Sequence, residues 1–195
     1  MEKSIHLKDG TEILIRDLRD DDVEQSLAFF RALPPEDRIY LRNDVTRREV
    51  IEERIRKMGT GKFLRLVAID NDGKIVADGS IETEGYTWKD HVAELRLIVA
   101  ADYRRRSVGM LLARELYLQA TKRRVEEIVA KIMRPQKAAL KVVKRLGFKE
   151  EAVLKDYVKD TDGIKHDLII MRCKLQDLLN ELENYISLSD WQRAR

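Results

Sequence analysis

The sequence predicts an α+β domain in which a mixed, twisted β-sheet is flanked by α-helices. The main observation is an alternation along the chain of strand-like apolar runs and amphipathic helical runs, in the order β-α-α-β-β-β-α-β-α-β-β followed by a short terminal helix. In addition, a chain of 195 residues with 44% hydrophobic residues is long enough for one continuous core. We expect a single domain over residues 1–175 and a helical extension over residues 176–195.

The first half of the chain predicts a strand, two helices and three further strands. Alternating apolar residues indicate the strands, and apolar residues at helical spacing indicate the helices. Pro34 and Pro35 end the first helix, and Thr46 and Glu49 have the spacing of a capping box at the start of the second. An Asn-Asp-Gly turn at 71–73 joins two strands as a hairpin. The expected elements are a strand at 11–18, helices at 20–33 and 46–59, and strands at 63–70, 74–82 and 91–102.

The second half predicts two longer helices that alternate with strands. A helix follows the strand at 91–102 and extends to about residue 122, and a second amphipathic helix ends at Gly147. The remaining expected elements are a strand at 125–133, the second helix within 135–148, strands near 149–158 and 164–173, and a terminal helix at 175–186.

Composition limits the classes of partner. A formal net charge of +3 is too small to indicate bulk binding of nucleic acid. The single cysteine, Cys173, excludes an internal disulfide framework and suits a reducing compartment. The sequence shows no signal peptide, no apolar stretch long enough to span a membrane, and no metal-ligand spacing. We therefore expect a cytoplasmic protein that binds neither nucleic acid, nor membrane, nor metal.

The stretch DYRRRSVGMLLARELYLQA (102–120) places a basic turn with small residues where a helix begins. Free N–H groups and the helix dipole favour an anion at such a point. Ser107 and Gly109 leave room for a phosphate, while Arg104, Arg105 and Arg106 add positive charge. The alternative is a solvated basic turn, because short glycine patterns are weak evidence. The apolar strand before the turn favours an elongated ligand.

Two motifs resemble those of the GNAT superfamily of acetyl-CoA-dependent N-acetyltransferases. VAADYRRRSVGMLL (99–112) resembles the pyrophosphate loop of that family, and PQKAALKVVKRLGF (135–148) resembles its next helix. The resemblance covers residues 11–174 and implies the GNAT fold, acetyl-CoA as co-substrate and no metal. Residues 7–42 and the pair Ala93-Glu94 are similar to the GNAT domains of bacterial protein lysine acetyltransferases, which implies a protein lysine as the acceptor.

The resemblance also implies roles for particular residues. Glu94 is the expected general base, which takes a proton from the acceptor ammonium directly or through water. A salt-bridged strand residue, paired with Arg96, is the alternative. A backbone N–H near Val99 is the expected donor to the oxyanion. The expected acetyl-CoA-binding residues are Leu97, Ile98, Val99, Arg104, Arg105, Arg106, Ser107, Val108, Gly109, Met110 and Gln136.

Three positions depart from the family pattern. Ser107 replaces a glycine of the loop, and its hydroxyl is expected to cap the helix or to bind a phosphate oxygen. Gln136 replaces an asparagine that meets the cofactor chain in the family. Val143 replaces the tyrosine that protonates the leaving thiolate in many members, so Tyr103, Tyr157, another group or solvent must supply that proton.

Several further residues have a structural and a functional interpretation. His91 is either an exposed loop histidine or a proton relay. Lys141, Lys144 and Arg145 form either a solvated helix face or contacts to the 3′-phosphate. Cys173 is interpreted as a small buried residue rather than a nucleophile.

The acceptor stays open at this point. A small amine such as a polyamine, an amino acid or an antibiotic is the alternative to a protein lysine. Val143 favours a rival class, a non-catalytic module that binds or senses acyl-CoA. Oligomeric state is equally open, with a homodimer among the alternatives.

Overall fold

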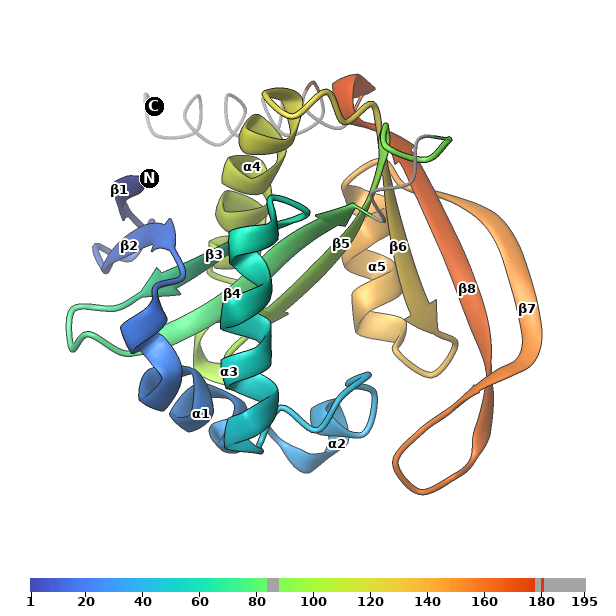
Figure 1. The fold of residues 1–195 in the computed structure, drawn as a ribbon, viewed down its shortest axis with the longest axis horizontal. Coiled ribbons are helices and arrows are strands. Elements are labelled where there is room, and N and C mark those ends of the chain that lie inside the picture. Colours follow the sequence, from blue (N-terminus) through green and yellow to red (C-terminus); the bar gives the residue numbers. More distant parts are fainter. Residues whose placement is uncertain (84–87, 178–179, 181–195) are drawn as a thin grey trace.

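An eight-stranded sheet runs through the molecule with helices on both faces (Figure 1). The structure is a computed structural model and describes residues 1–83, 88–177 and 180. The strand order is β1-β2-β3-β4-β5-β6-β8-β7, and every neighbouring pair is antiparallel except β5 and β6. The strands are β1 (Glu2–His6), β2 (Glu12–Asp17), β3 (Phe63–Ile69), β4 (Ile75–Thr83), β5 (Val92–Val99), β6 (Glu127–Met133), β7 (Lys149–Lys159) and β8 (Lys165–Lys174).

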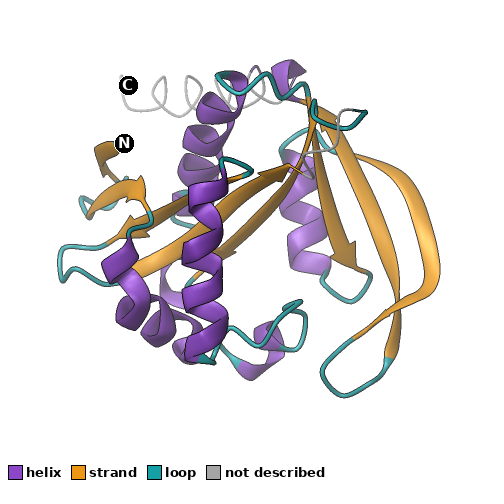
Figure 2. Cartoon of the chain, in the orientation of Figure 1, coloured by secondary structure: helices purple, strands orange, loops and turns teal. Residues whose placement is uncertain are grey.

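The helices divide between the two faces of the sheet (Figure 2). Alternate residues of β3 show the division, since Leu66 packs in one core and Val67 in the other. One face is covered by α1 (Val23–Ala32) and α3 (Arg48–Arg56), and the other by α4 (Val108–Thr121) and α5 (Lys137–Arg145). A short α2 (Pro35–Arg38) and 3-10 turns at 20–22, 57–60 and 101–103 join these elements.

Close approach of α4 to the sheet depends on Gly79 in β4. A Cβ atom there would lie 2.8 Å from Leu116 Cδ1 and 3.2 Å from Leu112 Cδ2, both on α4. Leu112 and Leu116 are fully buried. The absence of a side chain at Gly79 therefore lets α4 pack directly against the middle of the sheet.

The predicted fold class is confirmed, and several details differ. Strand β1 was missed because its residues are mostly exposed and show no apolar alternation, as suits an edge strand. The capping box predicted at Thr46 and Glu49 is wrong: the N-cap of α3 is Arg47, and Thr46 bonds to Asp44 instead. Pro35 ends no helical run but starts α2 as its first residue.

The ends of two other elements also shift, and the terminal helix is described only in part. The strand expected at 91–102 ends at Val99, and a 3-10 turn follows it. The helix expected at 20–33 begins with a separate 3-10 turn. Of the terminal helix expected at 175–186, residues 175–177 and 180 are helical, and the others lie outside the described residues. In the part of the chain that the structure describes, no helix has the length and apolar character needed to cross a membrane.

Candidate active site

The two parallel strands in the middle of the sheet separate along their length. Strand β5 pairs with β6 from Val92↔Glu127 to Glu94↔Val129, and beyond this point β5 continues to Val99. Figure 1 shows β5 and β6 diverging from their common end. Diverging strands leave backbone groups without ladder partners, so the edge of β5 beyond Glu94 is free to pair with a ligand.

The orientation of these backbone groups follows from the β4–β5 ladder. The N–H of Ala100 donates to the carbonyl of Val76 at 2.9 Å, so Ala100 faces β4. Because N–H and C=O groups alternate along a strand, those of Leu97 and Val99 face β6, and those of Ile98 face β4. Backbone groups of Leu97 and Val99 thus line the gap between the strands. Ile98, the third strand residue predicted to bind the cofactor, faces β4 instead.

Arg104, which was predicted to bind the cofactor phosphates, contacts the end of β5 and α2 instead. Its Nε donates to the Val99 carbonyl at 3.1 Å, and its Nη2 donates to Asp37 at 2.6 Å. The guanidinium therefore connects the end of β5 to α2. Arg104 thus occupies the Val99 carbonyl. A guanidinium donates hydrogen bonds but does not accept them, so the Val99 N–H stays available on the side of the gap.

The start of α4 offers three backbone donors. The first helical bond runs from Leu111 N–H to the Ser107 carbonyl at 3.0 Å, so the N–H groups of Val108, Gly109 and Met110 precede it. Ser107 is the N-cap, in a left-handed conformation with φ 65° and ψ 2°. Its side chain forms no capping hydrogen bond, which overturns the expectation that its hydroxyl caps the helix. The loop therefore keeps its donors turned outward at the positive end of the helix dipole.

The two following arginines differ in how firmly they are held. Arg106 donates to Asp9 at 2.7 Å and to Thr11 at 2.5 Å, and its guanidinium lies 4.8 Å from the centre of the Tyr103 ring. Arg105 adopts φ 59°. A pocket beside the loop is lined by Leu7, Lys8, Asp9, Arg105, Arg106 and Ser107. Arg106 thus anchors the loop to the β1–β2 turn, and Arg105 contributes positive charge to the pocket.

Gly109 lets the start of α4 lie close against β5. A Cβ atom there would lie 3.2 Å from Val99 Cγ2 and 3.5 Å from Leu97 Cδ2. The helix donors and the free edge of β5 are consequently neighbours, which is the arrangement that an elongated phosphate-bearing ligand requires.

The two positions in and just before α5 that depart from the family pattern have structural contacts. The Oε1 atom of Gln136 accepts a hydrogen bond from the Met133 N–H at 2.9 Å and so closes the turn between β6 and α5. Val143 is buried in the core between α5 and the sheet. Lys141 and Lys144 are exposed on the same helix.

The Glu94 side chain lies on the face of β5 opposite to α4, among three cationic side chains. Its carboxylate pairs with Arg42, with Lys131 Nζ at 3.0 Å and with Arg96 Nε at 3.6 Å. Burial raises the pKa of the Glu94 carboxyl, but Arg42, the hydrogen bond from Lys131 and Arg96 together hold that pKa below its ordinary value. Glu94 is therefore ionised at neutral pH.

Arg42 and Lys131 are the site residues that sequence reasoning missed. Arg42 lies in the segment between α2 and α3, and Lys131 lies on β6, so neither is near Glu94 in the sequence. A signal for Lys131 was present: it interrupts the apolar run that follows Glu127 in β6, on the side opposite Ile128, Ala130 and Ile132. Arg42 carried no comparable signal.

The contacts of the two tyrosines proposed as acids, Tyr103 and Tyr157, do not bring either of them to the Glu94 cluster. The Tyr103 hydroxyl donates to Asp70 at 3.0 Å, and burial together with this hydrogen bond raises the pKa of Tyr103. Tyr157 is exposed on the edge strand β7. His91 lies beside Asp90 at the start of β5, and Cys173 is buried as predicted.

The chain belongs to the acetyltransferase (GNAT) family, whose profile matches residues 24–148. It is therefore an N-acetyltransferase, of a family that uses acetyl-CoA as co-substrate and transfers the acetyl group to an amine. Among curated protein sequences, none matches this chain.

Solved structures of acetyltransferases share the fold. A ribosomal-protein-alanine N-acetyltransferase from Brucella melitensis is 24% identical, with a TM-score of 0.71 over 82% of this chain and 98% of its own. The GNAT domain of S. lividans PAT is 18% identical, with a TM-score of 0.71 over 89% of this chain and 96% of its own. A chimeric spermidine N-acetyltransferase from Vibrio cholerae and hSSAT is 18% identical, with a TM-score of 0.71 over 86% and 98%.

Proposed function

We propose that this N-acetyltransferase transfers the acetyl group by direct attack of a primary amine, with Glu94 as the general base and a protein lysine as the first candidate acceptor. The observation that carries the proposal is the position of Glu94. It lies on β5 at the last residue pair before β5 and β6 diverge, next to the edge proposed to bind the acetyl-CoA chain.

The residues present fit acetyl-CoA. The amides of Val108, Gly109 and Met110 would bind the pyrophosphate, with the free hydroxyl of Ser107 and the charge of Arg105 beside them. The backbone N–H and carbonyl of Leu97 would pair with the pantetheine chain, which leaves the Val99 N–H for the reacting thioester. Bound in this way, acetyl-CoA would supply an activated thioester in the gap between β5 and β6.

In the proposed reaction, the amine nitrogen forms a bond to the thioester carbonyl carbon, and the carbon–sulfur bond breaks. The proton of the attacking ammonium goes to Glu94, directly or through water. The Val99 N–H is proposed to stabilise the oxyanion. Because Val143 is buried and carries no acid, we propose that solvent protonates the leaving thiolate.

The lowered pKa of Glu94 makes it a weak base for an ammonium. A free lysine has a pKa of about 10.4, so transfer of its proton to a carboxylate is uphill. The cations around Glu94 lower the pKa of an incoming ammonium as well as that of Glu94, so a larger fraction of the bound amine is neutral before Glu94 takes a proton. We therefore propose that Arg42, Arg96 and Lys131 help to deprotonate the acceptor while they hold Glu94 in place.

The acceptor is tested by transfer of label. Wild type and Glu94→Gln are incubated with labelled acetyl-CoA and a cell extract, and the labelled proteins and small amines are separated and identified. We expect label on lysine side chains with wild type and at least about a hundredfold less with Glu94→Gln. Label confined to small amines would exclude the protein acceptor, and equal labelling by both proteins would exclude Glu94 as the base.

A further inference from the structure

The cluster around Glu94 contains more positive than negative charge. Two layers make up the cluster on this face of the sheet. In the deeper layer, Arg65 pairs with Asp78 at 3.0 Å and with Glu82 at 3.2 Å, and Arg54 pairs with Asp78 at 2.8 Å. Two cations and two carboxylates thus balance each other there.

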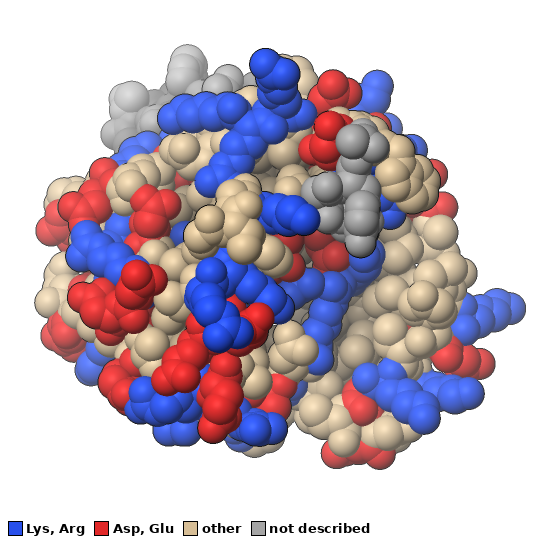
Figure 3. All heavy atoms as spheres, viewed as in Figure 1, with Lys and Arg blue, Asp and Glu red and all other residues tan. Residues whose placement is uncertain are grey.

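The outer layer is not balanced. Arg42, Arg96 and Lys131 surround the carboxylate of Glu94, and Arg96 also pairs with Glu82 at 3.1 Å, the carboxylate that Arg65 already contacts from the deeper layer. The side chains of the three outer cations are 41%, 37% and 31% exposed, whereas that of Glu94 is 16% exposed. The two layers together hold five cations and three carboxylates, so a ligand that enters beside Glu94 meets a cluster with a net charge of +2. Figure 3 shows Lys and Arg side chains along a hollow between α3 and the strands β6 and β8.

One donor of this layer has no acceptor. The Nε of Arg96 is buried and lacks a hydrogen-bond partner among the described residues, since its nearest oxygen on Glu94 lies at 3.6 Å. A buried N–H without an acceptor is costly. Because the Arg96 side chain is 37% exposed, its rotation toward the hollow would let an ionised ligand oxygen satisfy this donor with a charge-assisted hydrogen bond.

We propose that the acceptor is a primary amine that also carries a carboxylate, and that Arg96 and Lys131, with Arg42, recognise this carboxylate. The inference rests on the proposed function and names the substrate class of that site. An acceptor with a second ammonium in place of the carboxylate would be repelled by the same three side chains.

The strand geometry sets the spacing of the two groups. Arg96 lies two residues beyond Glu94 on β5, which separates their backbones by about 7 Å. A carboxylate held at Arg96 and an amine directed at Glu94 would therefore be joined by a chain of several bonds. A free amino acid with a terminal amine fits this description, and so does a lysine flanked by acidic residues in a peptide.

The test compares two acceptors that differ at one end. 5-Aminovalerate and 1,5-diaminopentane each present a primary amine on an unbranched chain, but one ends in a carboxylate and the other in an ammonium. We expect kcat/KM to be at least about tenfold higher for 5-aminovalerate at low salt, with the ratio falling as salt screens the charges. The methyl ester of 5-aminovalerate should lie between them. Two lysine peptides, one flanked by glutamates and one by arginines, test the peptide source in the same assay.

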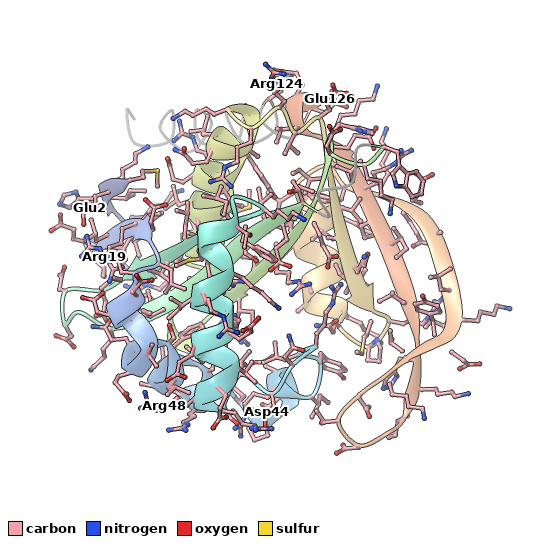
Figure 4. The ribbon with its side chains drawn as sticks, in the orientation of Figure 1. Glu2, Arg19, Asp44, Arg48, Arg124 and Glu126 are labelled. Carbon is pink, nitrogen blue, oxygen red and sulfur yellow. The ribbon has the colours of Figure 1, made fainter. Side chains whose placement is uncertain are left out.

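Variants assign the effect to the cluster. Arg96→Gln and Lys131→Gln should each reduce the ratio of the two kcat/KM values several-fold, and Lys131→Arg should restore it. Arg48→Gln and Lys57→Gln are matched controls: both residues form ion pairs on or next to α3, and Arg48 lies at the far end of α3 from the diverging strands (Figure 4). The controls should leave the ratio unchanged.

The outcomes separate this inference from the proposed function. Equal or faster reaction of 1,5-diaminopentane, or a ratio that neither cluster variant changes, would overturn the inference and leave the acetyl transfer intact. If no amine is acetylated, the proposed function fails. Calorimetric titration with glutarate, which carries carboxylates but no amine, then tests carboxylate recognition independently of acetyl transfer. Saturable glutarate binding that weakens in Lys131→Gln but not in Lys57→Gln would support it, and absence of binding would refute it.

Discussion

Replacing Ser107 by glycine should stabilise the protein. Ser107 has φ 65°, a left-handed conformation that costs a residue with a Cβ atom roughly 1–2 kcal/mol. The Ser107 hydroxyl does not offset this cost, because it forms no capping hydrogen bond. Glycine removes the strain but increases the entropy of the unfolded chain, which costs about 0.5–1 kcal/mol. The net gain in the free energy of unfolding is about 0.5–1 kcal/mol.

For a chain of 195 residues, this gain raises the melting temperature by about 1–4 °C. Thermal and urea unfolding of Ser107→Gly, Ser107→Ala and wild type measure it. Ser107→Ala is the matched control, since alanine keeps the Cβ atom and the strain while losing the hydroxyl. A Ser107→Gly protein that is no more stable than Ser107→Ala would refute the assignment of strain to this residue.

The Ser107 variants also test whether the loop binds acetyl-CoA. Calorimetric titration with acetyl-CoA should show unchanged or slightly tighter binding for Ser107→Gly, because the amides that follow it stay in place. Ser107→Tyr should block the phosphates sterically. If Ser107→Gly and Ser107→Tyr bind acetyl-CoA alike, the loop does not approach the ligand.

Three further substitutions and a pH profile test the site. Arg105→Glu should weaken acetyl-CoA binding by about tenfold, roughly 1.4 kcal/mol, and more so at low salt; unchanged calorimetric affinity would remove this loop from the site. Glu94→Gln should lower kcat by about a hundredfold or more with little change in acetyl-CoA affinity. Because the pKa of Glu94 is lowered, Glu94 stays ionised as pH falls toward 6. The wild-type rate between about pH 6 and 9 should therefore rise with deprotonation of the acceptor amine alone. A second pH-dependent change of the rate in this range that disappears in Glu94→Gln would contradict the ionised state of Glu94. Val143→Tyr places a larger side chain in a buried position and should destabilise the protein by about 1–3 kcal/mol; a stable variant with a faster turnover would show that the missing acid limits the enzyme.

The sequence predicted those features that depend on neighbours along the chain. Helix α4 and its basic start follow from local spacing, and the fold class follows from the order of the elements. The capping box at Thr46 failed because two competing bonds to Asp44, equally local, take its hydroxyl and N–H. The conformation of Ser107 was beyond reach for a related reason: its φ is set by the turn that joins β5 to α4, and serine itself does not prefer it.

The candidate site was predictable on one side only. Glu94 and the loop came from motifs, whereas Arg42 and Lys131 reach Glu94 from segments far away in the sequence. Lys131 does so through the parallel pairing of β6 with β5, which the sequence does not specify. The charge balance around the base, and with it the inference about the acceptor, therefore depends on the tertiary structure.

Strand β5 separates the two halves of the site. Its odd-numbered residues direct their side chains at α4 and their backbone groups at the gap, while Glu94 and Arg96 face the acceptor side. Substitutions on the acceptor side should accordingly leave acetyl-CoA affinity intact, because no side chain there is proposed to contact it. Arg104 is the exception, since it bonds both the Val99 carbonyl at the cofactor edge and Asp37 on α2, which leads into the segment that carries Arg42. Its guanidinium thus fixes the position of the acceptor-side segment relative to the cofactor strand, and this connection explains why an arginine of the basic loop points away from the phosphate site.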